Sequence, residues 1–288
     1  MKRKTKKRWW LRISMVLIAV VAGLAGYFLG FEQSHQESEK KLSEKGSETL
    51  YQSQKQAQQS DQGPVYAGEI KPSESVQPQE YCAKMETDIR DFFKYLDNKN
   101  YIKHLNERMD SYAEFRRILK KLSSHLPVPA GEGIDSTVMT KNIFHIFRTL
   151  SNTDIRFVKE IALNESETME LNLEMFYRWL LLGNQCPDPD EIRPSFDVLY
   201  HYAGFFLNTI GGRAYLSRRA MALRMLLSYY SLLIVHEADR RGSNTYGIDI
   251  FPYITPLSAE MAIYPDLKLK KEYIQKLNQM EDYYLQKR

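Results

Sequence analysis

One unbroken apolar run dominates the hydrophobic pattern of the chain. Residues 13–31 read ISMVLIAVVAGLAGYFLGF, nineteen positions without a charge. A helix of that length spans roughly 28 Å, close to the hydrocarbon thickness of a bilayer. The preceding residues 1–12 hold seven Lys and Arg and no acid, and basic residues beside a membrane segment stay cytoplasmic. The pattern predicts a single-pass membrane protein with a cytoplasmic tip at 1–12.

A cleaved signal peptide is the alternative for this run. Such peptides share the basic start, but their apolar region is about 7–15 residues long and ends in small residues. Gly23, Leu24 and Ala25 could form a cleavage site, yet Tyr27, Phe28 and Leu29 continue the apolar run. We therefore favour an uncleaved anchor.

Small residues recur every fourth position within the predicted anchor, at Ala22, Gly26 and Gly30. This spacing lets two membrane helices approach closely and can hold a homodimer. Glycine is also frequent in membrane helices generally, so the dimer is the weaker of the two interpretations.

The pattern after the anchor changes twice. Residues 32–78 are rich in Gln, Ser, Glu and Lys and poor in large apolar residues, a composition that favours a disordered tether. From residue 79 to 288, apolar residues recur at three-four spacing, which predicts one all-α domain of about seven to nine helices. The expected helices lie near 81–96, 102–122, 139–150, 153–162, 166–182, 195–210, 213–241 and from 266 onward.

Some elements of this domain carry more specific expectations. Thr153 is the expected cap of its helix, and the paired Gly211 and Gly212 are expected to end another. Glu167, Glu170 and Glu174 should form an outer acidic face. The segment 213–241 is apolar nearly all round and should be the central core helix. Residues 246–256 are expected to be irregular.

The charge distribution argues against nucleic acid as a partner. Seven of the 40 Lys and Arg lie in the tip, so the remainder of the chain carries 33 against 36 Asp and Glu. A nucleic-acid-binding domain shows a basic surplus or stripe, and none occurs outside the tip.

The two cysteines, Cys82 and Cys186, both lie beyond the anchor. In an oxidising compartment they could pair, and closing so long a loop would contribute roughly 4–5 kcal/mol in the chain-entropy model. Two unpaired buried thiols are the equally weighted alternative.

No catalytic, cofactor or metal motif is recognisable. His236 and Glu237 begin like a zincin helix, but Arg240 stands where the second histidine ligand belongs. His201 and His236 are better interpreted as half-buried core histidines with a hydrogen-bond partner. Phosphate-loop, dinucleotide and serine-hydrolase patterns are absent, so no cofactor is expected and an enzyme is disfavoured.

Four arginines, Arg213, Arg218, Arg219 and Arg224, crowd the expected start of the central helix. Cations are disfavoured there by the helix dipole, so something negative should lie nearby. A bound anion is one candidate, because the arginine fork suits carboxylate and phosphate. Internal pairing with Asp188, Asp190 and Glu191 or with the acidic face is the commoner outcome.

The sequence thus predicts a protein of the plasma (inner) membrane with an extracytoplasmic domain, periplasmic in a bacterium. In a eukaryotic type II protein, Asn164 would begin a glycosylation sequon. The preferred function is a non-enzymatic interaction or assembly module for another envelope protein. The alternative is a sensory domain that binds an anionic small molecule at the arginine-rich segment. The third possibility is an enzyme whose active site carries no recognisable motif.

Overall fold

The computed structural model describes residues 78–133, 135–181, 186 and 193–287, and within these ranges the chain is all-helical. The all-α prediction is therefore confirmed for this part. The predicted anchor, with Ala22, Gly26 and Gly30, and nearly all of the predicted tether lie outside the described residues. Among the described helices, none combines the length and apolar character that a membrane span requires.

Twelve helices are found in the described ranges, more than the seven to nine predicted. They are α3 (Pro78–Asp97), α4 (Asn100–Lys103), α5 (Ser111–Ser124), α6 (Ser136–Ile143), α7 (His145–Thr149), α8 (Asn152–Asn164), α9 (Met169–Leu181), α10 (Phe196–Asn208), α11 (Ile210–Ser217), α12 (Met221–Arg240), α13 (Phe251–Ile263) and α14 (Lys270–Lys287).

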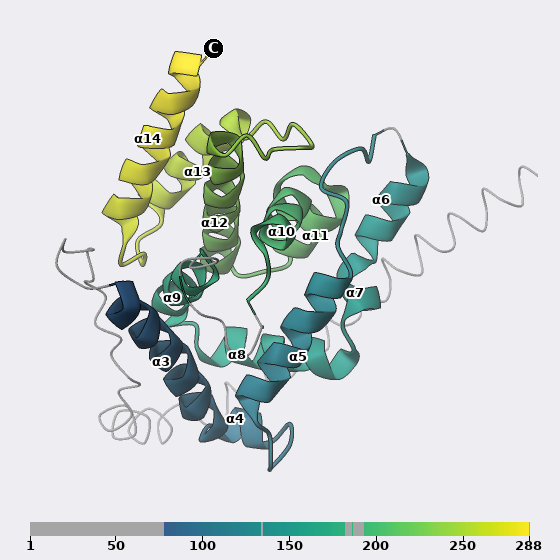
Figure 1. Ribbon diagram of the computed structural model, residues 1–288, viewed down its shortest axis with the longest axis vertical. Helices are drawn as coiled ribbons and strands as arrows, with labels where there is room; N and C mark the ends of the chain where they lie inside the picture. The colour runs from purple at the N-terminus through teal and green to yellow at the C-terminus, as the bar shows by residue number, and fades with distance from the viewer. Residues whose placement is uncertain (1–77, 134, 182–185, 187–192, 288) are drawn as a thin grey trace, which may run out of the picture. The chain divides into compact units, whose positions relative to one another are not determined.

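Helix α12 is the centre of the fold, with α10 and α13 beside it and α14 against α13 (Figure 1). Its side chains are buried around most of its circumference, as the apolar pattern predicts. We call the cluster that it organises the C-terminal core. Its most completely buried members are Met225, Leu232, Val235, Ala238, Ile250, Ile254, Met261 and Leu277.

A second cluster, the N-terminal core, gathers buried side chains from the part of the chain between α3 and α9, together with Cys186 and Phe205 of α10. Its members are Met85, Ile89, Phe92, Phe93, Leu96, Ile102, Ile118, Ile146, Leu150, Phe157, Met175, Trp179, Cys186 and Phe205. Helix α9 joins the two cores, because Met175 and Trp179 enter this cluster while Leu173 and Tyr177 pack against the other.

The extra helices arise where one apolar stripe continues through a break in the backbone. The stripe expected over 102–122 is divided between α4 and α5, and Asp110 caps α5 by accepting from the backbone N–H of Ala113 at 2.8 Å. Similarly, α6 and α7 divide the stripe expected over 139–150. The spacing of apolar residues indicates which side of a helix faces the core. It does not reveal a short turn between two successive helices whose apolar sides face the same core.

The Gly211–Gly212 pair does not end a helix, contrary to the prediction. Both glycines lie within α11, and α10 ends earlier, at Asn208. A Cβ on Gly212 would come within 1.9 Å of the Phe205 carbonyl oxygen, and one on Gly211 within 2.4 Å of that of Asn142. The glycines are therefore required for close approach of α11 to α10 and α6. The predicted helix 213–241 is correspondingly two helices, α11 and α12.

Two further expectations are wrong in part. Of the segment 246–256 expected to be irregular, residues 246–250 are non-helical but residues 251–256 begin α13, which places Pro252 in its first turn, where the missing N–H costs little. Glu170 is buried rather than outward-facing. Its carboxylate accepts from the backbone N–H groups of Lys268 and Leu269, both at 2.7 Å. It therefore caps the start of α14 from a distant helix.

The cap of α8 also differs from the expectation. Ser151, not Thr153, is the N-cap residue, with its hydroxyl accepting from the Asp154 N–H at 3.2 Å. The Asp154 carboxylate in turn accepts from the Ser151 N–H at 2.8 Å. This reciprocal pair is a capping box.

Candidate functional site

The N-terminal core encloses a cavity of about 370 Å³. Apolar side chains from α3, α5, α7, α8, α9 and α12 form most of its wall. The residues that line it are Phe92, Phe93, Phe115, Ile118, Leu119, Leu122, Ile146, Phe147, Leu150, Ile155, Phe157, Val158, Lys159, Ile161, Ala162, Glu165, Met169, Asn172, Leu173, Phe176, Phe206, Tyr215, Arg219, Leu223 and Leu227. We call this space the apolar cavity.

Aromatic rings that hold one another build one wall of the apolar cavity. Phe93 packs on Phe115 with ring centroids 4.6 Å apart. Phe176 packs on Phe92 and on Phe115, at 5.4 Å in both cases. Planar rings in such tilted and edge-to-face contacts are fixed by their neighbours. This mutual packing keeps them from turning inward to fill the space.

The apolar cavity reaches solvent beside α7 and α8. Phe147 and Val158 line it and are nevertheless 57% and 40% exposed. Large apolar side chains at such a position are unfavourable in water unless something covers them. A molecule entering the apolar cavity would cover them.

A buried carboxylate belongs to the lining but is already satisfied. Glu165 accepts from the hydroxyls of Tyr101 at 2.6 Å, Tyr95 at 3.2 Å and Thr168 at 3.1 Å. Burial, together with the hydrogen bond to the Glu165 carboxylate, raises the pKa of the Tyr101 hydroxyl. Tyr101 therefore stays a neutral donor, and hydroxyl groups hold the carboxylate by hydrogen bonds.

Arg219 is the lining residue with an unmet hydrogen-bonding requirement. Its guanidinium lies over the Tyr215 ring, 4.3 Å from the centroid. Its Nε is buried and has no hydrogen-bond partner in the described part of the chain. Buried polar groups are nearly always paired in folded proteins, so this donor marks a place where a ligand acceptor would fit.

The other three arginines of the predicted cluster do not converge with Arg219. Arg213 donates to the Leu207 carbonyl at 3.2 Å, and Arg224 forms an ion pair with Glu260. Arg218 is the C-cap residue of α11. The break between α11 and α12 places Arg213 on α11, Arg218 and Arg219 in the turn that follows it, and Arg224 on α12, whereas the expected single helix would have carried all four.

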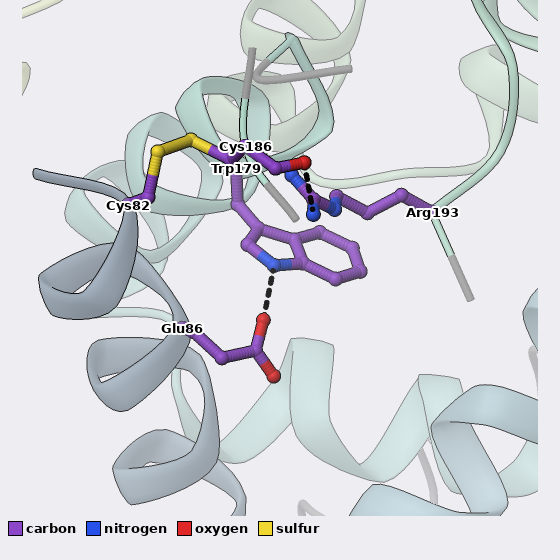
Figure 2. The surroundings of a disulfide bond; sticks show 5 residues. All are labelled: Cys82, Glu86, Trp179, Cys186 and Arg193. Atoms are coloured by element: carbon purple, nitrogen blue, oxygen red, sulfur yellow. Dashed lines mark hydrogen bonds between the residues drawn. A yellow bond between two sulfur atoms is a disulfide. The ribbon is translucent and has the colours of Figure 1, made fainter. Parts of the chain in front are cut away.

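Cys82 on α3 and Cys186 form a disulfide, with their Cα atoms 5.5 Å apart (Figure 2). Beside it, the Trp179 indole N–H donates to the Glu86 carboxylate at 3.1 Å. Arg193 donates to the Cys186 carbonyl, also at 3.1 Å. The disulfide therefore ties α3 to the segment after α9, next to a fully buried tryptophan.

The two histidines interpreted as core residues have hydrogen-bond partners. His201 Nδ1 lies 2.9 Å from the Pro127 carbonyl, and His236 Nδ1 lies 3.4 Å from the Tyr284 hydroxyl. Burial lowers the pKa of His236. No group of three or more His, Cys, Asp and Glu among the described residues is arranged to hold a metal ion.

Comparisons with protein-family models, curated proteins and solved structures found no match for this chain. Its function therefore has to be argued from its own residues. The apolar cavity is the feature that the sequence analysis missed. Its lining comes from eight helices and carries no motif, and the same apolar stripes would describe a filled core.

Proposed function

We propose that this chain is a membrane-anchored, non-enzymatic binding protein whose extracytoplasmic helical domain holds an apolar molecule. The observation that carries the proposal is the apolar cavity. Its volume of about 370 Å³ lies within the range of roughly 300–1,000 Å³ typical of small-molecule sites. Protein interiors otherwise contain few voids larger than a water molecule.

Two features support the anchored, extracytoplasmic setting of this proposal. The apolar run 13–31 and its basic flank are those of a membrane anchor. The Cys82–Cys186 disulfide favours an oxidising compartment outside the cytoplasm. A tether over 32–78 would let the domain receive a molecule at some distance from the bilayer.

The test is to ask what the full-length protein carries when it is purified from its host membrane. Native mass spectrometry of the chain in lipid nanodiscs should find a bound apolar molecule at defined stoichiometry. Ala162 lines the apolar cavity, so Ala162→Phe should fill it and abolish this binding. Leu163→Phe, at an exposed position on the same helix, is the matched control. Equal loading of both variants would refute the proposal.

A second candidate function, an interaction module for another envelope protein, is favoured by a different observation. Ile143, Phe144 and Ile210 are exposed where α6 and α11 meet. Exposed apolar side chains that gather in one place mark interaction surfaces. In-cell crosslinking of the full chain should capture a membrane or envelope protein, and Phe144→Asp should abolish that capture. A capture unaffected by this change would place the contact elsewhere.

A further inference from the structure

We propose that the molecule held in the apolar cavity is a single-chain amphiphile with an anionic head, and that Arg219 binds this head. The inference rests on the proposed function and specifies its ligand. The inference follows from an unpaired hydrogen-bond donor in the lining, the buried Nε of Arg219. An apolar molecule alone would leave this donor without an acceptor.

The charge on the ligand follows from two ionic groups of the lining, the buried Glu165 carboxylate and the partly buried Arg219, whose Nε is buried. Both Glu165 oxygens already accept from hydroxyl groups of Tyr95, Tyr101 and Thr168. The Arg219 guanidinium lies over the Tyr215 ring, and its Nε is unpaired in the described part of the chain. The outstanding requirement is therefore for an acceptor, and an acceptor that also carries a negative charge matches a guanidinium best.

The orientation of Arg219 suits a head group with two or more oxygens. Contact with the Tyr215 ring restricts the guanidinium, and its Nε remains available as a donor. A carboxylate or phosphate can accept two hydrogen bonds from a guanidinium in a parallel fork. The apolar body would lie along the aliphatic and aromatic wall, and the cavity volume suits one chain.

The experiment uses the full-length chain in nanodiscs of zwitterionic phospholipid. A dodecanoic acid bearing a photoreactive diazirine is crosslinked, and the labelled peptides are mapped by mass spectrometry. Dodecanoic acid, dodecyl phosphate and dodecanol then compete with the probe. A bound anionic head predicts labelling of cavity-lining peptides, and displacement by an acid or phosphate at a concentration about tenfold or more below that of the alcohol.

Three variants assign the preference to one residue. Arg219→Met keeps an apolar stem but removes the cation, so it should abolish the preference while dodecanol competes as before. Arg219→Lys should retain part of it. Arg218→Met, at a neighbouring residue outside the lining, should leave it unchanged. Circular dichroism verifies that each variant is folded.

The outcomes separate this inference from the proposed function. Labelling of the cavity with equal displacement by acid, phosphate and alcohol overturns the anionic head but leaves the proposed function standing. The absence of any cavity labelling overturns both. Stronger displacement by dodecyl phosphate than by dodecanoic acid would support the inference and assign the head as phosphate. If Arg219→Met does not fold, the comparison of competitors on the unaltered chain still decides.

Discussion

The two cores of this protein differ in how completely their apolar side chains fill the space between the helices. The C-terminal core surrounds α12, and its members from four helices reach complete burial. The N-terminal core is assembled from α3 and a series of shorter helices, and it leaves the apolar cavity between its aromatic walls. The disulfide belongs to this hollow core.

The difference shows what a central helix contributes. A helix that is apolar on all sides can be covered from every direction, so its neighbours meet around it. Short helices that each bury one stripe surround a common space instead, and rigid rings restrict how far that space can contract. We interpret the disulfide as a covalent link that compensates for the packing contacts that the N-terminal core lacks around the apolar cavity.

Removing the disulfide is the largest expected perturbation of this comparison. In the Cys82→Ser, Cys186→Ser double variant, the free energy of unfolding of the N-terminal core should fall by about 4–5 kcal/mol, because a loop of 104 residues is no longer closed. Hydrogen exchange by mass spectrometry should show faster exchange in α3 and α9 while α12 retains its protection. Equal loss in α12 would mean that the two cores unfold together.

Acid should weaken the N-terminal core through His145. Burial, with a smaller contribution from His125, lowers the pKa of His145 from 6.5 to about 4. Between pH 6.5 and about 4 this histidine is protonated in the unfolded chain but neutral in the folded chain. The free energy of unfolding therefore falls as the pH is lowered through this range, by about 3 kcal/mol in total. Urea unfolding at a series of pH values should show this slope, and His145→Gln should make it shallower, leaving the part that His236 contributes. The exposed His104→Gln variant should keep it.

A second acid-sensitive group in the same half should act at lower pH. Burial opposes ionisation of Asp154, but hydrogen bonds from Lys121, Ser151 and Arg117 prevail and lower its pKa from 3.8 to about 2. The ionised, paired carboxylate therefore stabilises the fold above pH 4 by about 2 kcal/mol, and this is lost as pH falls toward 2. Asp154→Asn should flatten that part of the stability profile. Asp91→Asn, on the exposed side of α3, should not.

The smallest expected effect concerns the junction between α9 and α14. Glu170→Gln removes the charge and one of the two acceptors that cap α14, so it should cost about 1 kcal/mol. Hydrogen exchange should accelerate at the Lys268 and Leu269 amides and spare the middle of α14. Glu167→Gln, an exposed position on the preceding segment, is the control. Equal acceleration in both variants would argue against the cap.

Much of the fold could be predicted from local spacing. The stripe from Met85 to Leu96 identifies the buried side of α3, and the apolar circumference of α12 identifies the central helix. These succeed because a three-four repeat places side chains on one side of a helix whatever its neighbours are. The candidate site could be predicted from the sequence only in part. Arg219 was among the predicted anion contacts, but nothing distinguished it from Arg213, Arg218 and Arg224.

The amino-acid pattern alone is enough to establish the helical class, the order of the buried stripes and the central position of α12, since each depends on residues a few positions apart. Tertiary structure decided where the helices end, why Gly211 and Gly212 are needed, and that Glu170 caps a helix nearly a hundred residues away. It also decided that the N-terminal core is hollow and that Arg219 lines its cavity. Each of these depends on close approach between distant segments, where backbone contact and the shape of unfilled space have no counterpart in local periodicity.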